Sequence, residues 1–333
     1  MSMVAIHGKF EHPALFYRSA REYVDRTVSF VQEGLDVGEP VAVAVPGPNL
    51  ELIREALGAD ARAVLLLDMA EAGRNPGRII PKVLRGFADG HRDGRVRIIG
   101  EPVWPGRSAL EYPACAQHEA LINAAFEGRA VTVLCPYDET RLDEEVLADA
   151  RTTHPTVLTG DTESASDAYD WRSVVARYNR PLPSVPDAAQ FPFGVQELAA
   201  ARAFAVERAQ RLGLAGQRLT DAELAVAELT TNSVVHGGGR GTLAVWEDGG
   251  QVVCEVRDTG RMIDPLAGRR PPAHGQIGGR GLMLVHYVAD LVRVYTADDG
   301  TTVRFYLDRV DRLGDAGPVG RADGAERAER VGR

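Results

Sequence analysis

The 333-residue chain has few cysteines, no long apolar run and no excess of basic charge. Its three cysteines are widely separated and form no Cys-x-x-Cys pair: Cys115, Cys135 and Cys254. This spacing argues against a disulfide framework or a zinc site, and it predicts three buried, reduced thiols. No segment could cross a bilayer and the first residues have no apolar signal region, so we expect a cytoplasmic protein without membrane contact.

The formal net charge is −9, and no basic cluster is interleaved with aromatic residues. Nucleic acids and anionic membranes both attract basic surfaces, so we expect no direct binding to either. The length predicts about two domains. Hydrophobic residues make up 44% of the chain, which suffices for ordinary globular cores.

Residues 1–160 alternate short apolar runs with segments of helical character. Strands are expected at 41–45, 64–68, 96–100 and 130–135, and helices at 19–31, 50–57, 75–87 and 112–126. This alternation predicts a parallel sheet with helices on its faces. Ligands bind beyond the carboxyl ends of such strands, where residues 46–49, Asp68, Glu101 and Asp138 fall.

Two features of this half resemble known sites but lack essential residues. The turn at 46–49 lies where a P-loop would lie, but it has no Gly-Lys-Ser/Thr ending to hold phosphates and metal, so nucleotide hydrolysis is not expected there. His118 and Glu119 share a predicted helix, but no histidine lies three residues after Glu119, so this is not a zincin site. We expect a partly exposed side-chain pair instead.

Five segments of this half together resemble a known sensory domain: HPALFYRSAREY, LLDMAEA, IIGEPVW, HEALINAAF and VTVLCPYD. They are similar to the MEDS domain, first defined in regulators of methanogens and methylotrophs. The resemblance covers roughly residues 8–160 and implies a RecA-like parallel α/β core without a working P-loop. It also implies that residues 1–160 sense a small ligand or partner, whose chemistry it does not name.

Residues 161–189 are expected to be a linker. The segment is rich in Ser, Thr, Asp and Pro, and a short helix is predicted at 169–178. Pro181, Pro183 and Pro186 disfavour helix and indicate a semi-rigid, extended spacer.

The second predicted domain, residues 190–308, opens with an alanine-rich helix at 195–212 and is organised around the next helix. Thr220 and Glu223 have the spacing of a capping box that would start this second helix. Glu228, Asn232 and His236 follow at intervals of four, which places them on one helical face. Taken alone, this face could equally be a solvated polar stripe.

The rest of the domain alternates strands with glycine-bearing segments. Strands are expected at 243–246, 252–256, 291–295 and 302–307. Asp258 and Gly260 end the second strand, where they suit either a plain turn or recognition of a nucleobase. Residues 261–277 are predicted to form a mobile lid. Gly279 and Gly281 then precede a helix, whose free N–H groups would suit an anion.

In their order, these elements resemble the GHKL (Bergerat) ATP-binding fold, an α/β sandwich shared by gyrase, Hsp90 and histidine kinases. The resemblance covers residues 190–307 and implies the cofactors ATP and Mg²⁺. It implies that Asn232 ligates Mg²⁺, that Asp258 reads adenine beside Gly260, and that a phosphate loop contacts ATP. That loop consists of Gly279, Arg280, Gly281 and Leu282. His236 stands where many relatives have a histidine, but a capping role is equally consistent with its position.

The sequence ELTTNSVVHGG is similar to the anti-sigma-factor serine kinase branch of this fold. That branch implies that Glu228 is the general base, and that the partners are a sigma factor and a STAS-type antagonist phosphorylated on Ser or Thr. It also implies a tendency to form homodimers. The tail at 309–333 is expected to be disordered.

Two alternatives stay open. The domain could bind ATP as a signalling module without transferring a phosphoryl group. A histidine kinase-like autokinase is disfavoured, because residues 151–190 are too polar, too short and too rich in proline for a dimerising hairpin that carries a phospho-accepting histidine.

Overall fold

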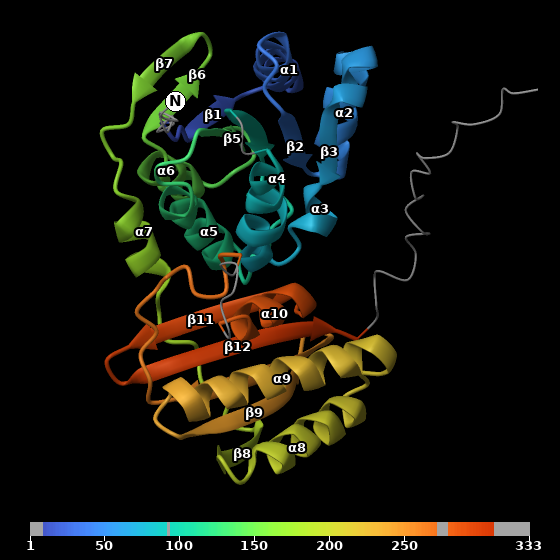
Figure 1. The fold of residues 1–333 in the computed structure, drawn as a ribbon, viewed down its shortest axis with the longest axis vertical. Helices are drawn as coiled ribbons and strands as arrows, with labels where there is room; N and C mark the ends of the chain where they lie inside the picture. The colour runs from blue at the N-terminus through green and yellow to red at the C-terminus, as the bar shows by residue number, and fades with distance from the viewer. Residues whose placement is uncertain (1–8, 92–93, 272–278, 310–333) are drawn as a thin grey trace, which may run out of the picture.

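The computed structural model describes residues 9–91, 94–271 and 279–309. Two sheets organise these residues into two layers: the first, upper layer is built on one sheet and the second, lower layer on the other (Figure 1). The first sheet has seven strands in the order β3-β2-β4-β5-β1-β6-β7, parallel except for the β6–β7 hairpin. The strands are β1 Pro13–Tyr17, β2 Val41–Val45, β3 Val64–Asp68, β4 Val96–Gly100, β5 Val131–Asp138, β6 Thr156–Thr159 and β7 Thr162–Ala165.

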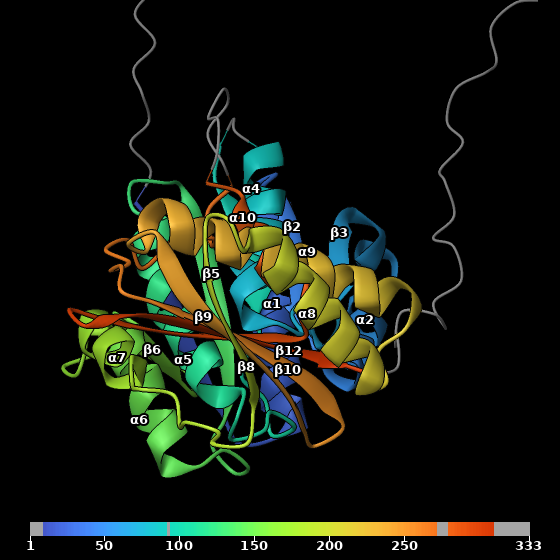
Figure 2. The ribbon, with the colours of Figure 1, turned by 90° about the horizontal axis from the view of Figure 1, so that it is seen from below.

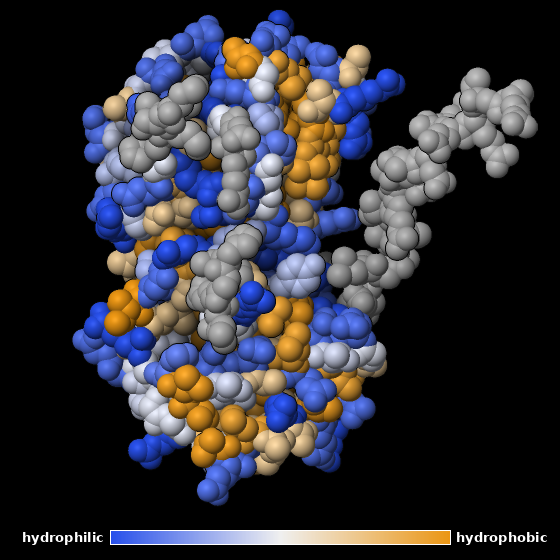
Figure 3. Space-filling view, viewed as in Figure 1, coloured by the Kyte–Doolittle hydropathy of each residue, from blue (hydrophilic) through white to orange (hydrophobic). Residues whose placement is uncertain are grey.

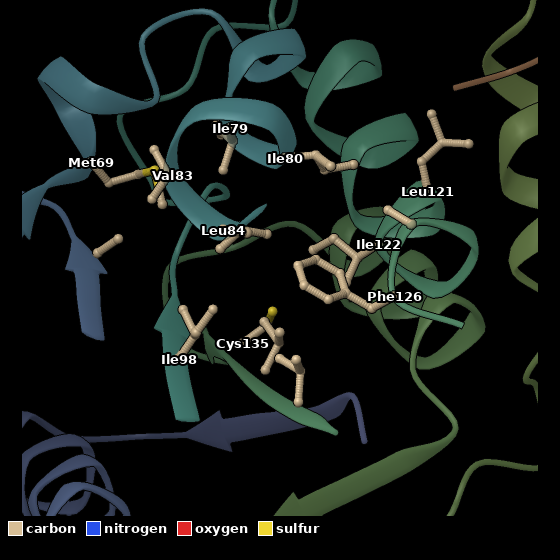
Figure 4. Close-up of a cluster of buried hydrophobic side chains, with 14 of the residues drawn as sticks. Met69, Ile79, Ile80, Val83, Leu84, Ile98, Leu121, Ile122, Phe126 and Cys135 are labelled. Atoms are coloured by element: carbon tan, nitrogen blue, oxygen red, sulfur yellow. The ribbon is translucent and has the colours of Figure 1, made fainter. Parts of the chain in front are cut away.

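Helices cover both faces of this sheet, so its central strands are buried on both sides. Strand β2 shows the consequence, because its side chains alternate between two hydrophobic clusters. Val41, Val43 and Val45 pack under α1 and α2, whereas Ala42 and Ala44 face the helices on the opposite side of the same sheet. Figure 4 shows part of that other cluster, in which Leu84 and Phe126 lie over Ile98 and Cys135 of the strands. The helices are α1 Ala20–Asp36, α2 Gly47–Leu57, η1 Gly58–Ala63, α3 Met69–Ala72, η2 Pro76–Arg78, η3 Ile79–Leu84, α4 Arg85–Gly90, α5 Tyr112–Ala125, α6 Glu144–Thr153 and α7 Trp171–Tyr178.

The second sheet is antiparallel, with five strands in the order β11-β12-β10-β9-β8. Its helices α8, α9 and α10 pack together on one face around a common apolar core, and Figure 2 shows α8 and α9 beside each other over the strands. The fold classes expected from the sequence, a parallel α/β domain followed by an α/β sandwich, are confirmed. The elements are β8 Ala189–Gly194, α8 Leu198–Arg211, α9 Gly216–His236, β9 Arg240–Asp248, β10 Gln251–Asp258, α10 Gly281–Val288, β11 Leu291–Ala297 and β12 Gly300–Asp308.

Several elements differ from the sequence-based expectation. Helix α9 begins at Gly216, so Thr220 lies inside the helix and does not cap it. The reason is Arg218, which is buried in the first turn and bonds Asp221 and Asp290. Strands β1, β6, β7 and β8 and helix α6 are not predicted from the sequence. Strands β7 and β8 lie at sheet edges, whereas β1 is a buried interior strand; all four have only four to six residues, too few to show a clear period.

Most of the expected linker belongs to the first layer. Strand β7 pairs with β6, and helix α7 packs on α5 through Val174 and Tyr178. The remaining stretch crosses to the second layer, where Asn179 donates to the Thr296 carbonyl and accepts from the Thr296 N–H at 2.8 and 3.0 Å. Of the tail expected at 309–333, residues 310–333 lie outside the described residues.

The two layers share a polar interface centred on Asp290, just beyond α10. Its carboxylate binds Arg74 of the first layer at 2.5 Å and Arg218 of α9, and it accepts the N–H of Asp308 at 2.7 Å. The side chain is 5% exposed, so its charge depends on these partners. Nearby, Ala114 of α5 packs against Val253, Leu291 and Tyr306 of the second sheet.

The first layer also caps the C-terminus of α10, whose last carbonyls have no partner within the helix. Asn75 donates to the His286 carbonyl at 2.8 Å, and Arg78 donates to the Tyr287 carbonyl at 3.3 Å. Arg218 donates to the Val288 carbonyl at 3.0 Å. Three side chains therefore complete this helix, and two of them come from the other domain.

The face shown in Figure 3 mixes hydrophilic and apolar residues. Among the described residues, no helix combines the length and the apolar character needed to cross a membrane.

We predict that Asn75→Ala destabilises α10 specifically. The substitution leaves the buried His286 carbonyl without its donor, which costs about 1–3 kcal/mol. Hydrogen exchange followed by mass spectrometry should show faster exchange across α10 than in the native chain. Gln196→Ala is the control, because it removes only a solvent-exposed side-chain amide. Unchanged exchange in α10 of the Asn75 variant would contradict the capping role.

Candidate functional site

Helix α9 carries the expected polar face, and its three side chains differ in exposure. Glu228 and Asn232 are half-buried, whereas His236 is exposed at the last helical position. The opposite face packs into the domain core through Ala222, Val226 and Leu229. The spacing of four therefore does align the polar residues, as expected, but only the first two lie against other parts of the domain.

The start of α10 lies directly against Glu228 and Asn232. A Cβ at Gly281 would come within 2.5 Å of Glu228 Oε2 and within 3.3 Å of Asn232 Nδ2. Only glycine fits this approach without displacing those side chains. The first turn of α10 therefore brings its free N–H groups and positive dipole end next to a carboxylate and an amide.

The other residues of the expected phosphate loop have distinct environments. Gly279 has φ +76°, a left-handed conformation that turns the chain into the helix. Arg280 is exposed at the N-cap position. Leu282 is 7% exposed and packs in the hydrophobic core, so its side chain has a structural role and only its backbone lies at the helix start.

Asp258 is held beside the C-terminal end of α9. The Ser233 hydroxyl donates to Asp258 Oδ2 at 2.6 Å, and the Gly260 N–H donates to Oδ1 at 2.9 Å. These bonds fix the carboxylate and leave each oxygen with a free lone pair. Gly237 lies so close that a Cβ there would be 2.3 Å from the Asp258 carboxyl carbon.

Gly260 is equally tightly placed, because a Cβ on it would lie 2.5 Å from the His236 carbonyl. Its own carbonyl accepts a hydrogen bond from the Thr301 hydroxyl at 2.7 Å. Ser233 and Thr301 were missed in the sequence, since each is a common residue within a regular element. The sequence did contain one clue: Ser233, directly after Asn232, places a hydroxyl on the buried face of the helix, where it needs a hydrogen-bond partner.

The expected mobile lid is described only as far as Pro271, and residues 272–277 lie outside the described residues. Two side chains of the described part are buried, although Ile263 is 86% exposed. Leu266, 4% exposed, joins the hydrophobic core of the first domain. Arg269 is 5% exposed, and burial lowers its pKa to about 10. The segment that follows Asp258 is thus anchored in the other domain.

A cavity of about 520 Å³ opens beside Asp258, lined mostly by residues outside the expected site. It is lined by the ends of β8, β9 and β10, including Phe193, Arg240 and Arg257, and it touches Asp258 and Thr259. Glu228, Asn232 and Gly281 do not line it. The close contacts of α10 with α9 therefore define the candidate site better than this cavity does.

The first domain has its own polar cluster at the carboxyl ends of its strands. Glu101 is 2% exposed and accepts hydrogen bonds from Asn49 Nδ2, at 2.9 and 3.0 Å, and from the Tyr23 hydroxyl at 3.0 Å. Asp68, also expected at this edge, instead caps α3 by accepting from the Ala70 N–H. The tertiary structure thus selects Asn49 and Glu101 from the sequence candidates.

Glu101 should make the stability of the chain depend on pH. Burial raises its pKa to about 8, the bonds from Asn49 and Tyr23 oppose this shift, and the charge of Asp138 adds to it. Tyr17, the other titratable neighbour, itself has a pKa raised by burial and by Glu101. Between the ordinary glutamate pKa and 8, the folded chain holds a proton that the unfolded chain releases, so stability falls as pH rises.

We predict that Glu101→Gln removes this dependence, which is at most about 1.4 kcal/mol per pH unit. Urea unfolding of both chains from pH 5 to 8.5 measures it. The exposed Glu55 on α2 offers the matched control, Glu55→Gln, which should keep the native slope. Identical slopes for the native chain and the Glu101 variant would refute the raised pKa.

Comparisons with known proteins give two family matches. Residues 11–155 match the model of the MEDS family, described as the methanogen/methylotroph DcmR sensory domain. Residues 191–307 match the model of the histidine kinase-like ATPase domain. No curated protein matches the chain.

A search of solved structures lists the RsbU and RsbW domains of Rv1364c from Mycobacterium tuberculosis, with 18% identity and a TM-score of 0.27. That similarity covers 36% of this chain and 32% of the other. The two family matches decide the domain identities: the chain carries a MEDS sensory domain followed by a histidine kinase-like ATPase domain.

Proposed function

We propose that this chain is a partner-switching regulator whose ATPase domain binds Mg·ATP, sequesters a sigma factor and phosphorylates a Ser or Thr of a STAS-type antagonist. The observation that carries the proposal is the contact of Gly281 with Glu228 and Asn232. It joins a helix N-terminus, a carboxylate and an amide in one place. Phosphoryl transfer needs a group for each of three tasks: binding phosphate, holding metal and accepting a proton.

The residues fit ATP and Mg²⁺. The side-chain-free surface of Gly281 leaves room for close approach to the N–H groups of α10, which suit phosphate oxygens. The Asn232 amide oxygen is a hard ligand suited to Mg²⁺. Asp258, fixed by Ser233 and Gly260, can accept a hydrogen bond from the exocyclic amine of adenine. When bound, ATP supplies the phosphoryl group and Mg²⁺ neutralises its charge.

Glu228 would act as the general base. Its carboxylate is half-buried one helical turn before Asn232 and reaches the start of α10, next to the phosphate-binding N–H groups. In that position it can accept the proton of an approaching serine or threonine hydroxyl as that oxygen attacks phosphorus. A chain that only binds ATP would need no such carboxylate.

The domain interface supplies a route for regulation. Asn75 and Arg78 of the MEDS domain hold the C-terminus of α10, while the glycine-bearing start of the same helix meets Glu228. Leu266 and Arg269, which follow the Asp258 turn, are buried against the MEDS domain. A change in the sensory domain would therefore shift α10 and the segment after Asp258 together, and with them the affinity for nucleotide.

We predict that Gly281→Ala weakens Mg·ATP binding at least about tenfold, because its Cβ would collide with Glu228 and crowd Asn232. Isothermal titration calorimetry on the full chain measures this affinity. Gly90→Ala is the control, since nothing lies within 4 Å of a Cβ there. Equal affinities for the two variants would remove the α10 start from the binding site.

We predict that Glu228→Gln keeps Mg·ATP affinity within about threefold but lowers phosphoryl transfer by about 10²–10⁴. The substrate is the antagonist recovered by pull-down with Mg·ATP, Mg·ADP or no nucleotide, and the readout is label transferred to serine or threonine. Glu223→Gln, on an exposed position of the same helix, is the matched control.

Full transfer by the Glu228 variant would refute its role as base. Nucleotide-dependent partner capture without any transfer by the native chain would favour an ATP-binding signalling module instead.

A further inference from the structure

Four side chains that can ligate metal meet in the interior of the MEDS domain. They come from separate parts of the chain: His12 just before β1, Glu119 on α5, Cys135 on β5 and His154 just after α6. Their ligand atoms all lie within 4.8 Å of one another, and each residue is at most 2% exposed. Figure 4 shows Cys135 among the apolar side chains that enclose this region.

The cluster contains Glu119, which the sequence predicts to be partly exposed together with His118. That expectation was wrong, because α5 runs through the interior and both His118 and Glu119 are buried. The helix packs against α6 and α7 on one side and meets the ATPase domain on another. Neighbouring residues on a helix point in different directions. Burial lowers the pKa of His118, and the charge on Arg269 of the ATPase domain adds to this effect.

Both imidazoles are oriented so that Nε2 faces the cluster with a lone pair. His154 Nδ1 lies 2.7 Å from the Ala150 carbonyl, which can only accept, so Nδ1 carries the proton. Asn123 Nδ2 already donates to the Ala120 and Thr153 carbonyls, which leaves Oδ1 to accept from His12 Nδ1. Metal-binding histidines typically donate their other ring N–H to an oxygen in this way.

Without a cation, this arrangement lacks positive charge at its centre. His154 Nε2 lies 3.1 Å from Glu119 Oε2, and His12 Nε2 lies 3.6 Å from the same oxygen. Among the residues that the structure describes, none forms a hydrogen bond with either Glu119 oxygen or with His154 Nε2. These buried nitrogen and oxygen atoms face one another in the interior, where polar groups without partners are costly.

We propose that His12, Glu119, Cys135 and His154 bind one divalent transition-metal ion, with Zn²⁺ the best match. Zinc bonds of about 2.0–2.3 Å in a tetrahedron separate the ligand atoms by roughly 3.3–3.8 Å. Three separations are close to that range. Glu119 Oε2 lies 3.1 Å from His154 Nε2 and 3.6 Å from His12 Nε2, and Cys135 Sγ lies 3.4 Å from His12 Nε2. Binding would displace the thiol proton of Cys135, and the two anionic ligands would balance the charge of the ion.

Ligand chemistry narrows the choice of metal. One thiolate and two imidazoles favour zinc and its neighbours Co²⁺ and Ni²⁺ over Mg²⁺ and Ca²⁺, which prefer oxygen. With four protein ligands and full burial, the site resembles a closed structural centre more than an open catalytic one. The same helix that supplies Glu119 carries Ala114 into the contact with the ATPase sheet, so occupancy of the site would position α5 at the domain interface.

The test uses the full chain, refolded from denaturant with Zn²⁺ or Co²⁺ and then freed of excess metal. We expect one equivalent of zinc by elemental analysis. We expect the Co²⁺ form to show tetrahedral ligand-field bands and a sulfur-to-cobalt charge-transfer band, which reports a thiolate ligand. The absence of that charge-transfer band in the folded native chain would overturn the proposal without reference to any variant.

Variants locate the site. Cys135→Ser should abolish the charge-transfer band and weaken Zn²⁺ affinity at least about tenfold, whereas Cys115→Ser, which alters another buried thiol of the same domain, should change neither. Asn123→Ala should weaken affinity about 10–100-fold by releasing the His12 ring, while the band persists. Metal binding that survives Cys135→Ser unchanged, or that Cys115→Ser removes, would place the ion elsewhere. None of these measurements depends on ATP or a protein partner.

Discussion

The carboxylate of Asp290 is the point on which the arrangement of the two domains depends. It lies just after α10, is nearly fully buried, and pairs with one arginine from each domain. Burial raises the pKa of this carboxyl, and the charges of Arg74 and Arg218 oppose that rise. Loss of one partner from such a buried pair costs about 3–5 kcal/mol, because the remaining charge is left without compensation. The buried ion pairs of Asp290 therefore fix how the two domains meet, in addition to the apolar contacts between them.

Helix α10 is short, and each of its ends meets a different set of residues. Its start packs on Glu228 and Asn232 through Gly281, and its last carbonyls are capped by Asn75, Arg78 and Arg218. With eight residues it has little stability of its own, so its position is set by these contacts. This dependence makes α10 a suitable element through which a sensory domain could alter a nucleotide site.

The MEDS domain contains two buried polar groups of different character. Burial raises the pKa of Glu101 at the carboxyl edge of the sheet, where ligands of parallel α/β domains bind. The cluster around Glu119 is deeper, and its geometry suits a cation rather than a proton. The low dielectric of the interior makes both groups costly unless they are satisfied, which is a reason to associate them with sensing rather than with folding alone.

By itself, the sequence determined the family of each domain and many of its elements, but not strands β1, β6, β7 and β8 or helix α6. Alternating apolar runs, the Glu228–Asn232 spacing and the glycines around Arg280 are local patterns, and local patterns follow directly from helix and strand periodicity. Only the tertiary structure decided what those residues contact. The burial of Glu119, the approach of Gly281 to Glu228, and the meeting of His12 with His154 each join residues far apart in the chain. Such pairings depend on how helices and strands pack in three dimensions, and no local spacing encodes them.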